Sequence, residues 1–250
     1  MNTSSTADAA IIFRNVSYAL DGARELLHNI DLEIRRGETL ILLGRSGSGK
    51  TTTLKLINRL LDPTDGEILV DSKPAREWDV IRLRRMIGYV IQEVGLFPHF
   101  TIERNIAVVP QLENWPADRI RGRVDELMDL VGLDRGLASR YPRELSGGQR
   151  QRVGVARALA ADPPILLMDE PFGALDPITR AELQREFAAL QRRLGKTVVF
   201  VTHDLREALL LGSRIALLED GQLIAVLTPD QFLHSIEPMV KAYVEAFNTQ

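Results

Sequence analysis

Eight consecutive residues of this chain match the pattern G-x-x-x-x-G-K-[ST]: Gly44-Arg45-Ser46-Gly47-Ser48-Gly49-Lys50-Thr51. In loops of this pattern, successive backbone N–H groups surround the phosphates of a nucleotide, and the lysine neutralises their charge. The apolar run 38–43 predicts a buried strand before the loop, and residues 52–57 predict a helix after it. We therefore expect ATP or GTP at this loop, with Thr52 among the contacts; a plain glycine turn is the alternative.

The composition is that of an ordinary globular protein. The 250 residues are 45% hydrophobic and carry a formal net charge of −3, which gives no overall electrostatic reason to expect nucleic acid. The sequence has no cysteine, which excludes disulfides, thiolate catalysis and cysteine-based metal sites. The arginines at 82–85 and 150–152 are expected to form solvated faces rather than a nucleic-acid surface.

The sequence shows no signal for membrane insertion or export. No apolar run approaches the roughly 18 residues that a membrane-spanning helix needs. Residues 1–10 lack the basic and apolar regions of a signal peptide, and their Ser, Thr and Ala content is typical of a flexible tail. We expect a chain that neither spans a membrane nor is secreted.

Apolar, β-branched runs predict the strands of an α/β fold. These runs lie at 11–18, 30–34, 39–43, 67–70, 87–91, 165–168, 197–202, 214–218 and 223–227. Several are continuous rather than alternating, which favours strands buried on both faces of a parallel sheet that helices cover. Turns of flanking antiparallel hairpins are predicted at Asp21-Gly22, Asp65-Gly66 and Asp220-Gly221.

The spacing of apolar residues becomes helical between 101 and 159. Three prolines, Pro110, Pro116 and Pro142, are expected to break these helices. We therefore expect a helical subdomain inserted between two halves of an α/β core.

Two acidic residues, Asp169 and Glu170, end the buried run that begins at Ile165. Ligands of parallel sheets bind at the carboxyl edge, where these side chains would lie. We expect Asp169 to hold a Mg²⁺ ion shared with Thr51, and Glu170 to polarise the water that attacks the γ-phosphate. Without the upstream phosphate loop, a strand that enters a solvated turn would be the simpler interpretation.

A second motif, Leu145-Ser146-Gly147-Gly148-Gln149, precedes a helical run over 150–161. Ser146 and Gln149 have the spacing of a capping box, in which each side chain bonds the other residue's backbone N–H. Two glycines in the first turn of a helix are unfavourable by about 1 kcal/mol each relative to alanine, so bare backbone N–H groups are expected to serve a function there. A phosphate at the positive end of the helix would be that function.

Together these motifs resemble the nucleotide-binding subunits of ATP-binding cassette (ABC) transporters, over about residues 11–233. The resemblance implies that the phosphate loop of one subunit and the Ser146–Gln149 loop of a second enclose one ATP, so that two ATPs join a head-to-tail homodimer. It also assigns residues by position: Tyr18 to stacking on adenine, Gln92 to Mg²⁺ and the attacking water, Ala174-Leu175-Asp176 to the loop that crosses the dimer, and His203 to the γ-phosphate. Glu170, His203, Gln92 and Lys50 are then the expected catalytic residues, and Thr51, Gln92 and Asp169 the Mg²⁺ ligands.

The resemblance implies an α/β P-loop NTPase (RecA-like) core with a mostly parallel central sheet, flanking antiparallel strands and an inserted helical signature subdomain. The expected boundaries are a flexible tail over 1–10, the core over 11–95 and 160–230, the helical subdomain over 96–159, and a short helical end over 231–250. Plainer roles remain open for four residues: Tyr18 as a strand-end aromatic, Gln92 as a surface amide, Asp176 as a helix cap, and His203 as a structural residue.

The segment 87–110 is similar to ATPase subunits of bacterial importers for glycine betaine, choline, carnitine and related quaternary-amine osmoprotectants. In that family the region of Gln92–Pro98 contacts integral membrane permease subunits, so Leu96, Phe97 and Pro98 would be exposed for a partner; packing inside the helical subdomain is the alternative. The resemblance further implies a periplasmic or extracellular solute-binding protein, and a peripheral location on the cytoplasmic face of the inner membrane. Another cargo, such as amino acids or lipids, and a soluble ABC ATPase acting on ribosomes or DNA are the alternatives.

Two features depart from the family pattern. Many osmoprotectant ATPases carry a regulatory tail of paired small domains, whereas this sequence ends at Gln250 after a short helical segment, so ionic-strength sensing through such a tail is not assumed. Arg45 occupies a phosphate-loop position at which relatives usually have Pro or Ser, and its contacts cannot be predicted from the sequence.

Overall fold

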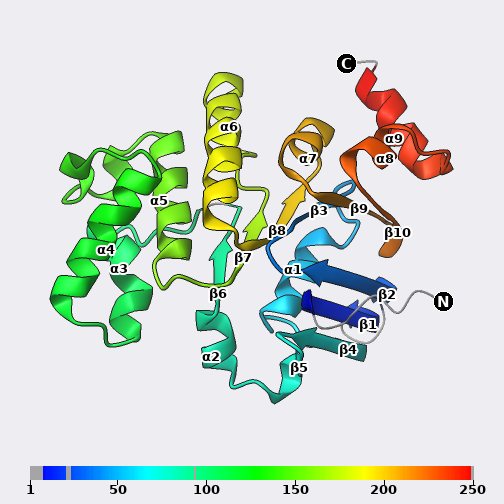
Figure 1. The fold of residues 1–250 in the computed structure, drawn as a ribbon, viewed down its shortest axis with the longest axis horizontal. Coiled ribbons are helices and arrows are strands. Elements are labelled where there is room, and N and C mark those ends of the chain that lie inside the picture. The colour runs from blue at the N-terminus through cyan, green and yellow to red at the C-terminus, as the bar shows by residue number, and fades with distance from the viewer. Residues whose placement is uncertain (1–7, 21–23, 93, 249–250) are drawn as a thin grey trace. The chain divides into compact units, whose positions relative to one another are not determined.

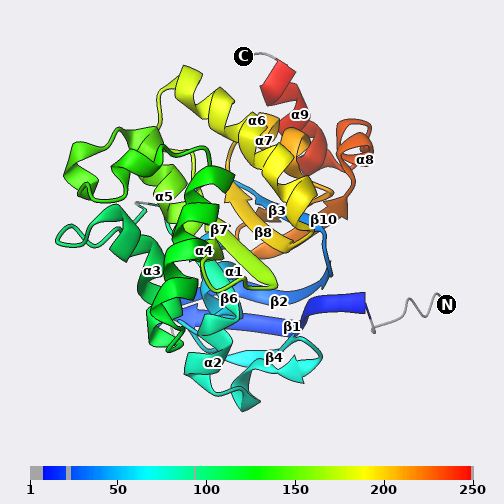
Figure 2. The same ribbon diagram turned by 60° about the vertical axis from the view of Figure 1, so that its left-hand side comes forward.

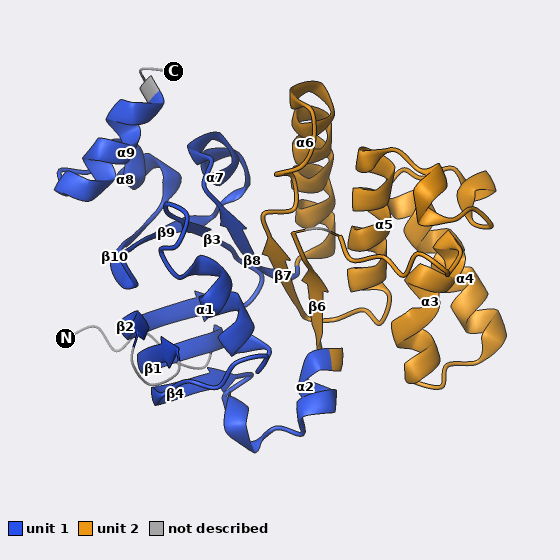
Figure 3. Ribbon diagram, turned by 180° about the vertical axis from the view of Figure 1, so that it is seen from behind, with its two compact units in different colours: residues 1–84, 196–250 blue, residues 85–195 orange. Residues whose placement is uncertain are grey.

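The computed structural model describes residues 8–20, 24–92 and 94–248. The chain divides into two compact units (Figure 3). Unit 1 comprises residues 1–84 and 196–250, and unit 2 comprises residues 85–195. Unit 2 contains the helices predicted at 96–159 and, in addition, two strands and a long helix.

An antiparallel sheet forms one layer of unit 1, with the strand order β2-β1-β4-β5. Its strands are β1 (Ala9–Leu20), β2 (Arg24–Arg35), β4 (Asp65–Val70) and β5 (Lys73–Pro74). The expected tail over 1–10 is too long by its last two residues, because Ala9 and Ala10 are buried in β1, where Ala9 pairs with Arg35. Residues 1–7 lie outside the described residues.

The second layer of unit 1 contains β3 (Thr39–Leu43), β8 (Thr197–Thr202), β9 (Arg214–Glu219) and β10 (Gln222–Leu227). β3 pairs in parallel with both β8 and β9, and all of its residues are buried. This burial confirms the prediction that the run 39–43 forms a strand buried on both faces of a parallel sheet. β10 pairs with β9 in an antiparallel hairpin, and Asp220 and Gly221 both adopt positive φ at its turn, as predicted.

The described part of unit 1 contains the helices α1 (Lys50–Ile57), α7 (Leu205–Leu211), α8 (Pro229–Leu233) and α9 (Pro238–Asn248), and all but the last residue of α2 (Val80–Arg85). α1 contacts β2, β4 and β8 and therefore lies between the two layers (Figure 1). β3 leads through the phosphate loop directly into α1, as the sequence predicts.

Unit 2 contains β6 (Ile87–Val90) and β7 (Ile165–Asp169), which pair in parallel. Its helices are α3 (Ile102–Leu112), α4 (Ala117–Leu130), α5 (Gly147–Leu159) and α6 (Pro177–Leu194). α3, α4 and α5 pack against one another (Figure 2). Short 3-10 turns lie at Ala75–Glu77 in unit 1 and at Arg135–Leu137 and Pro142–Glu144 in unit 2.

The predicted α/β fold class is confirmed, and every predicted strand is present. Two turn and break predictions are wrong. Pro110 lies inside α3, which continues for only two more residues, so a proline there disturbs little of the helix. Asp65-Gly66 lies within β4, where Gly66 (φ 79°) accompanies a register shift, rather than between two strands. Asp21-Gly22 lies outside the described residues.

Candidate functional site

The phosphate loop of unit 1 has a backbone that depends on glycine. Gly49 precedes α1 with φ 98°, a left-handed conformation that disfavours other residues. A Cβ atom at Gly44 would lie 2.2 Å from the carbonyl oxygen of Leu218, so the loop passes too close to β9 for a side chain there. Both glycines are thus required by the shape of the loop, before any ligand is considered.

Polar groups inside this loop are arranged for an anion. Lys50 is only 5% exposed, and its Nζ donates to the carbonyl oxygens of Gly44 (2.9 Å) and Arg45 (2.7 Å). The buried Ser48 Oγ has no hydrogen-bond partner. Thr51 and Thr52 lie half-buried in the first turn of α1, which contains no acidic residue. A buried ammonium beside an unsatisfied hydroxyl fits the phosphates of a nucleotide.

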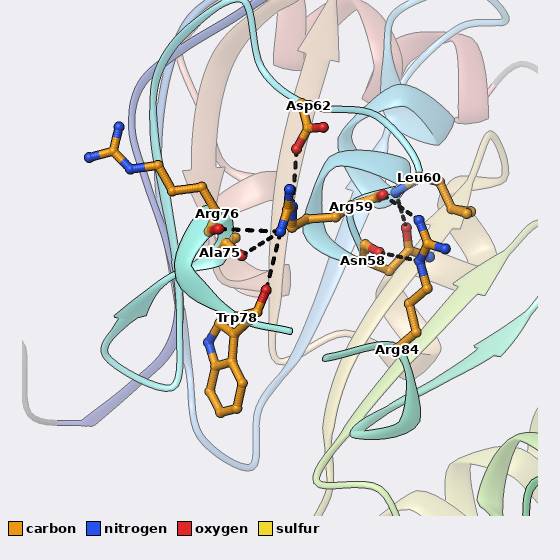
Figure 4. Close-up of polar contacts among 8 residues, drawn as sticks. All are labelled: Asn58, Arg59, Leu60, Asp62, Ala75, Arg76, Trp78 and Arg84. Atoms are coloured by element: carbon orange, nitrogen blue, oxygen red, sulfur yellow. Dashed lines mark hydrogen bonds and ion pairs between the residues drawn. The ribbon is translucent and has the colours of Figure 1, made fainter. Parts of the chain in front are cut away.

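The far end of α1 is held by two arginines (Figure 4). Arg59 follows the helix and donates to the carbonyl oxygens of Ala75, Arg76 and Trp78 and to Asp62. Arg84 donates to the carbonyl oxygens of Asn58 and Arg59. These cations lie at the negative end of the α1 dipole, where they are stabilising. Arg84 therefore has a structural role and is not simply part of a solvated face.

His203 follows β8 and is exposed. Leu43 pairs with Thr202 in the parallel register of β3 and β8, so the phosphate loop and His203 begin at the same sheet edge within unit 1. Thr202 Oγ1 donates to Glu207 Oε2 (2.5 Å) and accepts from the backbone N–H of Asp204, which fixes the turn around His203. Two of the predicted site elements are thus brought together by one strand pair.

Tyr18, predicted to stack on adenine, is buried in β1. Tyr18 is only 9% exposed and pairs with Leu27, two residues before β1 ends. The exposed apolar residue of this region is instead Leu20 (46% exposed), which ends β1. Leu27 lies beside Gly49, since a Cβ there would be 2.5 Å from Leu27 Cδ2, so this hairpin borders the phosphate loop.

In unit 2, Asp169 and Glu170 lie at the carboxyl end of β7, as predicted. Asp169 is 4% exposed, and the Tyr89 hydroxyl donates to its Oδ2 (3.4 Å). Burial, followed by the negative charge of Asp169, raises the pKa of Tyr89 well above its usual range. Glu170 adopts φ 41°, a conformation that is strained for a residue with a side chain and is typical of functional sites.

Gln92 follows β6 and is exposed. Val90 pairs with Met168, so the parallel register of β6 and β7 brings Gln92 to the same edge as Asp169 and Glu170. Among the described residues no group of three or more His, Cys, Asp or Glu side chains forms a metal site. An ion at this edge would therefore take further ligands from hydroxyl, amide, phosphate or water oxygens.

The segment after Gln92 is held in an unusual conformation; Glu93 lies outside the described residues. Val94 (φ 57°) and Gly95 (φ 54°) are both left-handed, which is an outlier for a β-branched valine. Arg157 of α5 donates to both of their carbonyl oxygens, at 2.6 and 2.7 Å. Burial lowers the pKa of Arg157.

The surface that follows this turn is apolar, and a buried side chain of α3 hydrogen-bonds its backbone. Phe97 (42% exposed) and Pro98 are exposed, and Leu96 is half-buried. The fully buried Asn105 of α3 accepts from the Phe97 backbone N–H and donates to the Phe97 and Phe100 carbonyl oxygens. The alternative, in which these residues pack inside the helical subdomain, does not describe the exposed Phe97 and Pro98, whereas Leu96 is half-buried.

Ser146 and Gln149 form the predicted capping box at the start of α5. The Gln149 backbone N–H donates to Ser146 Oγ (3.2 Å), and the Ser146 N–H donates to Gln149 Oε1 (2.8 Å). Gly148 has a steric reason that the sequence does not show, since a Cβ there would lie 2.8 Å from Thr179 Cγ2 of α6. For Gly147 the nearest such atom, Leu175 Cδ2, is at 3.4 Å, so close packing explains this glycine less well.

Asp176 caps α6 by accepting from the backbone N–H groups of Ile178 (3.1 Å) and Thr179 (3.0 Å). These hydrogen bonds, led by Thr179, lower the pKa of Asp176. The alternative role of Asp176 as a helix cap is therefore present in the structure. A contact with a second subunit would be an additional role.

A family model described as ABC transporter matches residues 27–173, more than half of the chain. The chain belongs to the ABC transporter family. The glycine betaine/carnitine/choline transport ATP-binding protein OpuCA of Bacillus subtilis is 54% identical over 220 residues, which are 88% of this chain and 58% of the relative. The osmoprotectant import ATP-binding protein OsmV of Salmonella typhimurium is 55% identical over 206 residues, 82% of this chain and 54% of the relative.

Among solved structures, the dimeric ATP-binding cassette MJ0796 bound to ADP and Pi has a TM-score of 0.79 and 35% identity, covering 88% of this chain and 98% of that one. The chain spans a little over half the length of the two curated relatives. No helix in the described part of the chain is both long and apolar enough to cross a membrane.

Proposed function

We propose that this chain is the ATP-binding and ATP-hydrolysing subunit of an ABC importer for quaternary-amine osmoprotectants of the glycine betaine, choline and carnitine type. The observation that carries the proposal is the phosphate loop, where the buried Lys50 ammonium and the unsatisfied Ser48 hydroxyl lie within a glycine-dependent backbone. The cargo follows from relatives named for transport of these solutes, because an ATP-binding subunit does not itself contact cargo.

In this proposal the site residues predicted from the sequence supply the chemistry. Lys50 and the loop N–H groups bind the phosphates, Glu170 polarises the attacking water, and His203 donates a hydrogen bond to the γ-phosphate. Thr51, Gln92 and Asp169 offer the oxygen ligands that Mg²⁺ prefers. When bound, Mg²⁺ neutralises phosphate charge.

We further propose that two copies pair head to tail and enclose two ATPs. Ser146, Gly147, Gly148 and Gln149 of one copy would face the phosphate loop of the other, and Asp176 would lie at the dimer interface. Support comes from α5, whose first-turn N–H groups lack intrahelical partners, and from Gly147, whose missing side chain is not explained by packing. The dimeric state of the cassette MJ0796 is consistent with this arrangement.

The membrane partner is proposed to bind at the Gln92–Pro98 region. Phe97 and Pro98 present apolar surface there, and hydrogen bonds from Asn105 and Arg157 fix the backbone of this segment. The proposed partners are integral membrane permease subunits, with a solute-binding protein outside the membrane, and no nucleic acid. The subunit would act peripherally at the cytoplasmic face of the inner membrane.

Leu20 replaces Tyr18 as the residue proposed to lie against the adenine. We expect Leu20→Trp to tighten ATP binding about tenfold, because base–aromatic stacking contributes about 1–3 kcal/mol. Titration with a fluorescent ATP analogue measures this, and Leu60→Trp, at another exposed leucine of unit 1, is the matched control. Equal affinities for the Leu20 variant and the parent would remove Leu20 from the site.

Copurification of the native complex tests the transport proposal. Its solute-binding subunit should be thermally stabilised by betaine or choline and not by amino acids. Stabilisation by amino acids or lipids instead would assign another cargo. A chain that copurifies with ribosomes or DNA and no membrane protein would favour the non-transport alternative.

A further inference from the structure

Arg45, the phosphate-loop residue that departs from the family pattern, has a partner in unit 1. Its side chain is 79% exposed, and Nε lies 3.8 Å from Glu219 Oε1. Glu219 ends β9, which pairs with the strand that leads into the loop, and it is only 9% exposed. A buried carboxylate thus lies beside a loop built for anions, where it would repel phosphate unless it is compensated.

The second oxygen of this carboxylate accepts a hydrogen bond from the C-terminal helix α9. Tyr243 of α9 donates its hydroxyl to Glu219 Oε2 (3.3 Å). Burial, followed by the Glu219 charge, raises the pKa of Tyr243 to about 12, whereas the charge and backbone N–H of Arg45 act in the opposite direction. Tyr243, Glu219 and Arg45 therefore form one cluster, which we name the C-terminal brace.

Both ends of the brace are anchored. On α9, Val240 is fully buried, and the Phe247 ring packs against the Arg206 guanidinium of α7 at 5.5 Å. At the loop, the Arg45 carbonyl oxygen accepts from Lys50 Nζ at 2.7 Å. The contacts run in series from α9 through Tyr243, Glu219 and Arg45 to the lysine at the centre of the phosphate loop.

We infer that Tyr243 is a positioning residue for nucleotide binding, which acts through Glu219 to hold Arg45, and with it the phosphate loop, in the binding conformation. The inference rests on the proposed binding of ATP at this loop. The hydroxyl fixes the carboxylate, the carboxylate fixes the guanidinium, and a loop ordered before binding loses less entropy when ATP binds. Packing of α9 against the rest of unit 1 thereby contributes to the nucleotide affinity.

Titrations with a fluorescent ATP analogue test this in the full chain, for the parent, Tyr243→Phe, Arg45→Ala and the double variant. Each single variant should weaken binding roughly threefold to tenfold, the effect of one typical hydrogen bond. Because the contacts act in series, the affinity of the double variant should be no lower than that of the single variant with the lower affinity. Tyr141→Phe, at an exposed tyrosine of unit 2, is the matched control and should bind like the parent.

Melting temperatures of the same variants distinguish a positioning role from a loss of folding stability. The exposed Arg45 side chain can be removed without disturbing the core. The inference is overturned if Tyr243→Phe binds like the parent, if the two losses multiply in the double variant, or if Tyr141→Phe weakens binding equally. A parent chain that does not bind the analogue at all refutes the proposed function itself, which the variants alone would not.

Discussion

Glu170→Gln is expected to lower steady-state ATP turnover about 10²-fold, because glutamine keeps the shape of the side chain but cannot polarise water or take up its proton. ATP affinity should change by less than about threefold, since the variant keeps the backbone contact from the Gly173 N–H to the residue 170 carbonyl oxygen. Phosphate release and nucleotide titration measure the two quantities on the same preparation.

Glu144→Gln is the control for this change, because Glu144 is an exposed glutamate of unit 2 whose partners are Arg140 and the Tyr141 backbone N–H. Its turnover should match the parent. Near-parental turnover of Glu170→Gln would show that Glu170 does not act on the attacking water.

Lys50→Ala is expected to weaken ATP binding about 10²-fold. The ammonium is buried among loop carbonyl groups, and its charge-assisted hydrogen bonds contribute about 1.5–3 kcal/mol each once phosphates replace those carbonyls as acceptors. The measurement is calorimetric titration with ATP, with Lys55→Ala on the same helix as the control. Binding within about threefold of the parent would place the phosphates elsewhere.

Much of the fold follows from short-range patterns. The run 39–43 is continuously buried in β3, and Gly49 of the motif supplies the left-handed backbone (φ 98°) that the loop needs before α1. The Ser146–Gln149 cap is likewise complete within four residues. Features of this kind can be predicted because all the interacting groups are close together in the sequence.

The burial of Tyr18 and the exposure of Leu20 could not be predicted in the same way. Strand β1 has register shifts between Val16 and Tyr18 and again between Tyr18 and Ala19. Such irregularities change which side chains face the interior, so simple alternation fails there. Tyr18 is buried as a result, and Leu20 is exposed.

Other features depend on contacts between segments far apart in the sequence. Gly148 is required by Thr179, and the left-handed Val94 is held by Arg157. Arg45 and Glu219 are in contact although they lie far apart in the sequence. Local pattern carries no signal for these pairs, although an arginine at an unusual loop position did mark the last of them.

The central claim is that two copies of this chain close around ATP. The most direct measurement is the molar mass of purified Glu170→Gln by light scattering during gel filtration, with saturating ATP and Mg²⁺ and with ADP as the comparison. The account predicts a dimer with ATP and a monomer with ADP. A Glu170→Gln protein that binds ATP with parental affinity yet remains monomeric at high concentration would contradict it.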